Sequence, residues 1–162
     1  MILVVADTTP LRYLVEIGLE GLLPALFEGI RVPGAVVVEL RNAGAPAVVR
    51  EWAARFPCWV VVSEVEGDPS AVDASGLGRG EWEALELAAR IRAQLVLIDE
   101  RAGARVARLR GFQVTGTLGV LVAAARANLV SIDEALGRLG RTNFRVSRDL
   151  VERVRAEGKR GR

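Results

Sequence analysis

Short runs of consecutive apolar residues recur along the chain, separated by segments in which apolar side chains return every three or four positions. A short unbroken apolar run is typical of a strand buried on both faces, whereas the second spacing is typical of a helix with one buried face. The predicted strands cover residues 2–6, 30–33, 59–62, 95–98 and 112–115. Because helical patterns lie between and after these strands, the sequence favours a parallel sheet covered by helices on both faces.

Residues 81–92 carry the clearest helical pattern of the chain. The apolar stripe of this helix consists of Ala84, Leu87, Ala88 and Ile91, and the opposite polar stripe consists of Glu83, Glu86 and Arg90. Glu81 lies three residues before Ala84, on the apolar stripe, so its carboxylate is expected to point inward. A carboxylate in that position needs a cation or hydrogen-bond donors.

Further helices follow from the same spacing and from capping residues. They are predicted from Thr8-Thr9-Pro10 to Ile17, at 22–27, at 46–55, directly after Asp99, at 117–127, from the Ser131 capping box to Leu139, and from Ser147 to about Ala156. Residues 64–80 are rich in Gly, Asp and Ser and are predicted to form a surface connection. Residues 158–162 are expected to fray.

Two neighbouring segments are harder to assign. Residues 30–33 resemble a short edge strand that ends in proline. In residues 34–40, three consecutive valines favour a strand, whereas the preceding proline suits the start of a helix. Propensity alone favours the strand slightly.

Composition favours one domain and a reducing compartment. The chain has 162 residues, 51% of them hydrophobic, with a mean hydropathy of +0.26, which is enough for one sizeable core. It shows neither a leader with a cleavage site nor an apolar run of the ~20 residues that a membrane helix needs. The single cysteine, Cys58, is expected to be a buried structural thiol. We therefore expect a soluble, cytoplasmic protein whose single domain covers residues 1–157, followed by a frayed basic tail at 158–162.

The absence of histidine restricts the possible chemistry. A chain without histidine has no Ser-His-Asp or Cys-His nucleophile and no zinc site that uses imidazole. Net charge is only +2, but residues 138–162 hold nine basic against three acidic residues, a net charge of +6. Of the 22 basic residues 21 are arginine, which suits phosphate contacts but is equally explained by genome composition.

Two predicted strands end in aspartate. Asp7 follows the strand at 2–6, and Asp99 follows the strand at 95–98. Ligands of open parallel sheets bind outside the carboxyl ends of the strands, so both acids stand where chemistry is expected. The simpler alternative for Asp99 is that it caps the helix starting at Arg101. Together with Glu81 and Glu39, these oxygen ligands suit Mg²⁺ or Mn²⁺, which can activate water for phosphodiester hydrolysis.

Other candidate features have competing structural explanations. The Gly76-Leu77-Gly78-Arg79-Gly80 segment follows no strand, so a flexible loop is favoured over a dinucleotide site. Threonines at strand exits either hold water at the site or only cap helices; they are Thr8, Thr9, Thr115 and Thr117. Trp82 either stacks on a base or, the favoured alternative, packs against a neighbouring helix or subunit. The arginines Arg101, Arg105 and Arg108 and those of the terminus either follow an RNA backbone or form a solvated face.

Five motifs, taken in order, resemble the PIN-domain family. They are Val5-Ala6-Asp7-Thr8-Thr9-Pro10-Leu11, Val32-Pro33 with Glu39-Leu40, Gly80-Glu81-Trp82-Glu83-Ala84-Leu85, Leu97-Ile98-Asp99-Glu100-Arg101 and Val114-Thr115-Gly116-Thr117-Leu118-Gly119. The last motif is similar to that of the VapC-like toxin ribonuclease branch. The resemblance runs from Val4 to about Leu150, nearly the whole chain.

The resemblance implies a fold, an activity and partners. It implies a three-layer α/β/α domain with a central, mostly parallel sheet, and it makes residues 34–40 a helix. The implied activity is that of an endoribonuclease dependent on Mg²⁺ or Mn²⁺, the toxin of a toxin–antitoxin pair, with RNA as substrate, a small antitoxin as partner and a homodimer as its assembly. The catalytic and metal-binding residues carried over by position are Asp7, Glu39, Glu81 and Asp99.

Two points of this assignment stay open. The third acid of the family is usually aspartate and is Glu81 here, so direct contact with metal is less secure than metal binding through water. Glu83 and Glu100 are rivals for the third and fourth acid, although helix phase points Glu83 outward and Glu100 lies one residue past the strand end. The alternative function is a PIN-like module that binds RNA or protein without cutting.

Overall fold

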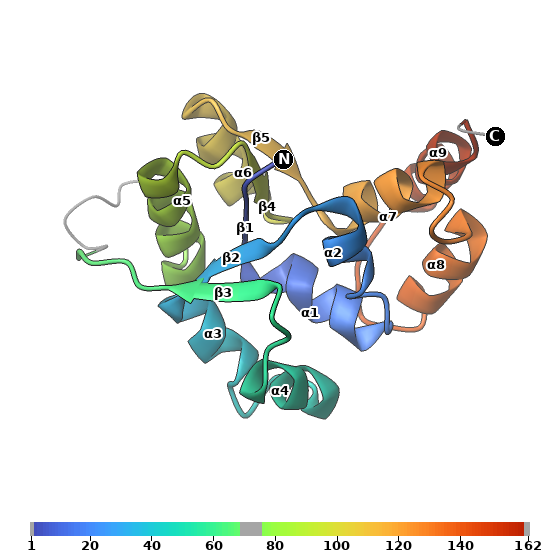
Figure 1. The fold of residues 1–162 in the computed structure, drawn as a ribbon. Helices are drawn as coiled ribbons and strands as arrows, with labels where there is room; N and C mark the ends of the chain where they lie inside the picture. Colours follow the sequence, from blue (N-terminus) through green and yellow to red (C-terminus); the bar gives the residue numbers. More distant parts are fainter. Residues whose placement is uncertain (1, 69–75, 161–162) are drawn as a thin grey trace.

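The central sheet consists of five strands, all parallel, in a computed structural model that describes residues 2–68 and 76–160 (Figure 1). The strands are β1 (Val4–Ala6), β2 (Ile30–Pro33), β3 (Val60–Ser63), β4 (Leu95–Leu97) and β5 (Gln113–Thr115). Their order across the sheet is β3-β2-β1-β4-β5. The register pairs Val4 with Ile30 on one side of β1 and with Leu95 on the other.

Nine helices lie within the described residues. They are α1 (Thr8–Glu16), α2 (Leu22–Leu26), α3 (Gly34–Leu40), α4 (Ala47–Ala54), α5 (Arg79–Ile91), α6 (Arg101–Leu109), α7 (Thr117–Arg126), α8 (Ile132–Leu139) and α9 (Arg148–Lys159). The two predicted serine caps are confirmed, because Ser131 accepts a hydrogen bond from the Glu134 N–H and Ser147 accepts one from the Leu150 N–H. None of the described helices is long and apolar enough to cross a membrane.

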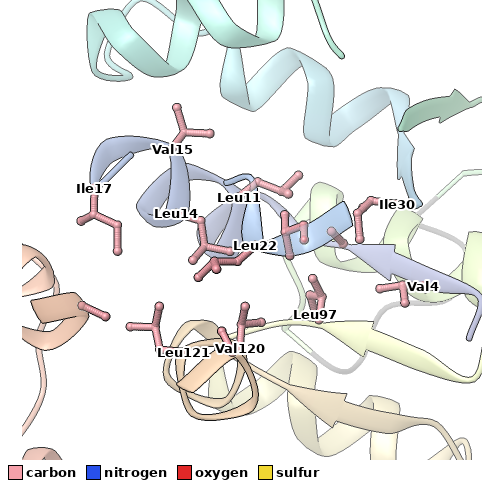
Figure 2. Close-up of a cluster of buried hydrophobic side chains, with 14 of the residues drawn as sticks. Val4, Leu11, Leu14, Val15, Ile17, Leu22, Ile30, Leu97, Val120 and Leu121 are labelled. Carbon is pink, nitrogen blue, oxygen red and sulfur yellow. The ribbon is translucent and has the colours of Figure 1, made fainter. Parts of the chain in front are cut away.

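Both faces of the sheet are covered, which confirms the predicted three-layer α/β/α fold. Successive side chains of a strand point to opposite faces. Val4 and Ala6 therefore join the larger core, with α1, α2 and α7 among its helices, whereas Val5 joins the smaller core under α5 and α6. Figure 2 shows the larger core, where side chains from α1 meet those of β1, β4 and α7. This cover explains the unbroken apolar runs of β1 and β4, which are buried along their whole length.

Four local predictions were wrong or undecided. Cys58 was expected to be buried and is exposed. β2 is not an edge strand, since it pairs with β1 and with β3, and its proline stands at its last position. Residues 34–40 form helix α3, so the slight preference for a strand was wrong and the preceding proline was the better signal. α9 continues to Lys159, past the expected end near Ala156, and Gly158 is buried. Residues 69–75 of the predicted surface connection, like 161–162 at the end, lie outside the described residues.

The strand order places a topological switch point between β1 and β4. From β1 the chain continues to β2 and β3 on one side, and then crosses to β4 and β5 on the other. Helices that follow β1 and β4 diverge from such a point and leave a crevice at the carboxyl ends of the strands. The residues that follow these two strands, Asp7 and Asp99, therefore stand beside each other, and the Asp7 N–H donates to the Leu97 carbonyl at 2.9 Å.

Candidate active site

Asp7 is the buried centre of the site. It is the N-cap of α1 and only 3% exposed. Its Oδ1 is buried and has no hydrogen-bond partner among the described residues. Burial raises the pKa of Asp7 to about 7, against the lowering effect of a hydrogen bond from the Thr8 backbone. A buried carboxylate oxygen without a donor is costly unless a proton or a cation compensates it.

Asp99 is held by the start of another helix. Its Oδ1 accepts the Thr117 N–H at 2.8 Å, and its Oδ2 accepts the Thr117 hydroxyl at 2.6 Å. The expected alternative, a cap on the helix that follows, is wrong, because Glu100 is the N-cap of α6. Burial raises the pKa of Asp99, while the two Thr117 hydrogen bonds lower it. Asp99 thus joins the end of β4 to the beginning of α7.

Glu39 reaches the site from the last turn of α3. Its Oε2 accepts a hydrogen bond from the Thr8 hydroxyl, and its Oε1 accepts the Gly80 N–H at 3.2 Å. Glycine at position 80 leaves room for this carboxylate, since a Cβ there would lie 2.6 Å from Glu39 Oε1 and would displace it. The sequence suggested that this glycine was part of a flexible loop. It lies instead in the first turn of α5, where it lets the backbone approach this carboxylate.

Glu81 lies in the first turn of α5 and is partly buried, as its helical phase predicted. Its Oε2 lies against Gly103 of α6, where a Cβ would be only 2.7 Å away. Burial raises the pKa of Glu81, and the negative charges of Glu100 and Glu39 raise it further. The close approach to α6 brings this carboxylate to the same end of the sheet as the other acids.

The structure brings all four predicted acids together. The carboxylates of Glu81, Glu39 and Asp99 each raise the pKa of Asp7 through their negative charge, so all three are electrostatic neighbours of the Asp7 carboxylate. Glu100 is exposed and stands at the rim, where it raises the pKa of both Glu81 and Asp99. Asp7 and Asp99 lie together because their strands meet at the switch point. Glu39 and Glu81 reach the same place because α3 and α5 pack beside it.

Glu83 does not point outward, and this prediction was wrong. Its side chain is only 5% exposed, accepts the Ala35 N–H at 2.8 Å, and forms an ion pair with Arg79 at 3.2 Å. The polar stripe was misjudged because α5 packs against α3 as well as against the sheet. Glu83 therefore connects the start of α3, which carries Glu39, to the helix that carries Glu81.

Of the other candidate residues, two threonines donate hydrogen bonds to the four acids, whereas Trp82 and the arginines make no such bond in the part of the chain that the structure describes. Thr8 and Thr117 each donate a hydroxyl proton to one of the acids. Trp82 is 5% exposed, which contradicts base stacking and favours packing in the interior. Arg101, Arg105 and Arg108 are all exposed on α6. In contrast, Arg155 of the basic terminus forms ion pairs with Asp133 and Glu152, which connect α9 to α8 and to itself.

The acids fit a hard divalent cation. The four acids offer oxygens alone, and the Asp7 carboxylate, whose buried Oδ1 has no donor among the described residues, lies within reach of the other three negative charges. Within residues 2–68 and 76–160, no three acidic side chains lie close enough to ligate one ion directly. Mg²⁺ usually retains several waters and binds through one or two carboxylates, so the remaining acids can act through water.

One comparison with known proteins identifies the family of this fold. A family model described as a PIN domain matches residues 3–159, nearly the whole chain. No curated protein and no solved structure matches the chain significantly.

Proposed function

Because the chain belongs to the PIN-domain family, we propose that it is a metal-dependent endoribonuclease that hydrolyses RNA phosphodiester bonds. PIN domains are generally nucleases, and PIN nucleases generally use divalent metal ions. The observation that carries the proposal is the grouping of Glu39, Glu81 and Asp99 around the buried Asp7 carboxylate, whose Oδ1 has no hydrogen-bond partner among the described residues. A protein that used this end of the sheet only as scaffold would have no need to hold four acids against their mutual repulsion.

Each acid has a separate task in the proposed mechanism. A bound Mg²⁺ or Mn²⁺ would supply charge neutralisation and the Lewis acidity that activates water for attack on phosphorus. Asp7 and Asp99 would hold the cation, and Thr117 fixes the direction of Asp99. Glu39, held by Thr8 and Gly80, would orient the attacking water. Glu81 completes the charge of the site directly or through water.

The biological setting is proposed from sequence resemblance. The Gly116-Thr117-Leu118-Gly119 segment is similar to that of VapC-like toxins, so we propose the toxin of a toxin–antitoxin pair. A small antitoxin protein, a homodimer and a cytoplasmic location belong to the same proposal. Residues 1–157 would then act as one nuclease domain. Identification of a small antitoxin gene directly upstream would support this setting.

The central experiment is a cleavage assay with single-stranded RNA and DNA of the same sequence. We expect RNA to be cut in Mg²⁺ or Mn²⁺ and left intact in EDTA, because the acids alone cannot offset the charge that develops on the phosphate. Cutting that persists in EDTA, with a contaminating nuclease excluded by an Asp7→Asn preparation, would contradict the mechanism. RNA that is bound but never cut in either cation would identify the alternative, a non-catalytic RNA-binding module.

The arginines of α6 are expected to contribute more to RNA binding than those of α9. Arg101 and Arg105 are exposed on the helix that follows Asp99, whereas α9 lies on the side of the molecule away from α3 and α5 (Figure 1). Replacing Arg101 and Arg105 by alanine should weaken RNA binding in EDTA and reduce its salt slope by about 0.7 for each phosphate that the protein then leaves unneutralised.

The matched control for this measurement is the exposed pair Arg148 and Arg153 on α9, also replaced by alanine. Arg155 is left intact because its ion pairs hold α9 to α8. If the α9 pair changes the salt slope and the α6 pair does not, the basic terminus is the RNA surface, as its net charge first suggested.

A further inference from the structure

A hollow of about 270 Å³ adjoins the candidate active site between α1, α3 and α4. Thr8 and Glu39 form the wall that it shares with the acid cluster. Thr8 directly follows Asp7 in the chain, so a group in this hollow lies beside whatever the acids hold. We call this hollow the Arg12 pocket, after the cation on its wall.

Two polar side chains of the Arg12 pocket offer donors. Arg12 forms one long contact with Glu16, 3.5 Å from Nε to Oε2, and its two Nη groups make no hydrogen bond within the described part of the chain. The Oδ1 of Asn42 accepts a hydrogen bond from the Gly44 N–H at 2.9 Å. The NH₂ group of this amide is therefore the part that can bind a ligand, as a donor. Both residues therefore present donors to a ligand.

The rest of the wall is apolar. Ala45 is partly exposed and faces the hollow, whereas Leu40 and Val49 lie fully buried beneath its floor. An apolar surface with a few directed donors at its edge matches a nucleobase, which has flat apolar faces and an edge of hydrogen-bonding atoms. A phosphate alone would leave the apolar wall without a partner, and the neighbouring Glu39 carboxylate would repel it.

We propose that the Arg12 pocket binds the base of the RNA nucleotide next to the cleaved phosphate and selects guanine. This inference rests on the proposed ribonuclease function. Guanine presents two adjacent acceptors, O6 and N7, which match the two-pronged donor geometry of an arginine side chain. The Asn42 amide adds a further donor on the same wall. The pocket thus makes the cut depend on sequence, whereas the acids and cation act on the phosphodiester group that all nucleotides share.

The cleavage site in an RNA is first mapped with the unmodified protein. The test then uses oligoribonucleotides in which one of the two nucleotides that flank this site is varied through all four bases. We expect guanine to be preferred at one of these two positions. Arg12→Ala should lower kcat/KM for the guanine substrate by about 10- to 100-fold, the size of one good bidentate base contact, and should leave the other three substrates nearly unchanged. Asn42→Asp should reduce the same preference while its Oδ1 still accepts the Gly44 N–H.

Arg50→Ala is the matched control, because Arg50 is exposed on α4 and does not line the pocket. Binding of the same labelled oligonucleotides in EDTA, measured by fluorescence anisotropy, gives a second readout that needs no cleavage. The inference is overturned if the unmodified protein cuts without preference for guanine. It is also overturned if Arg12→Ala lowers kcat/KM for all four substrates equally and therefore differs in no selective way from Arg50→Ala. If no RNA is cut, the ribonuclease proposal fails, and the anisotropy measurement still decides whether the pocket selects guanine.

Discussion

Asp7→Asn should make the metal-free protein more stable at alkaline pH and at the same time inactive. Asp7 has a pKa of about 7 in the folded protein against an ordinary value of 3.8. Since one pKa unit corresponds to 1.36 kcal/mol, ionisation of Asp7 destabilises the fold by about 4 kcal/mol. Asparagine keeps the shape of the side chain and removes that charge. Stability gained together with activity lost is typical of a functional residue that strains its fold.

The pH dependence of this effect has a definite sign. The folded protein retains the Asp7 proton more tightly than the unfolded chain does, so its stability falls as pH rises from about 4 to about 8. The stability gain of Asp7→Asn should therefore be near zero at pH 4 and complete above pH 8. Denaturant unfolding in EDTA at several pH values measures it, and cleavage in Mn²⁺ measures activity.

Asp149→Asn is the control for the loss of one negative charge, because Asp149 is exposed in the first turn of α9. This variant should be active, and its unfolding free energy relative to the unmodified protein should not change between pH 5 and 9. An Asp7→Asn protein that is less stable than the unmodified protein at pH 8 would show that Asp7 is a structural cap of α1 whose charge the fold requires.

Saturating Mn²⁺ should stabilise the unmodified protein and leave Asp7→Asn nearly unaffected. A ligand that binds only the folded state contributes about 2.7 kcal/mol at a hundred times its Kd. For a chain of this length that corresponds to a rise in Tm of roughly 5–10 °C. Asp99→Asn should also lose most of the gain, although its Oδ1 can still accept the Thr117 N–H and preserve the junction of β4 and α7.

Thermal melts in EDTA and in Mn²⁺ separate these outcomes, with Asp149→Asn again as the matched variant. Asp149→Asn should retain the full Mn²⁺ shift. If Asp99→Asn is strongly destabilised in EDTA and keeps the full shift, then Asp99 serves only to hold Thr117. If both Asp7→Asn and Asp99→Asn keep the full rise in Tm with Mn²⁺, the cation binds elsewhere and the proposed ligands are wrong.

Much of the fold was predictable because its elements leave local patterns. Strands covered on both faces by helices appear as unbroken apolar runs, as β1 and β4 do, and the segments of all five strands were found in the sequence. An acid at the end of such a run must lie at the carboxyl edge of the sheet, so Asp7 and Asp99 could be placed together before any packing was known. Glu81 was found by its helical phase. Their role as metal ligands stays a proposal.

The amino-acid sequence was enough to predict the order of the elements, the parallel sheet and the acids that follow two of its strands. Each of these depends on residues close together in the chain. Everything that depends on which elements become neighbours was decided by tertiary packing. Packing made β2 an inner strand, buried Glu83 between α5 and α3, and gave Asp99 a partner 18 residues away in Thr117. Local spacing determines which side of an element is apolar, but only packing determines which distant donor or charge that side meets.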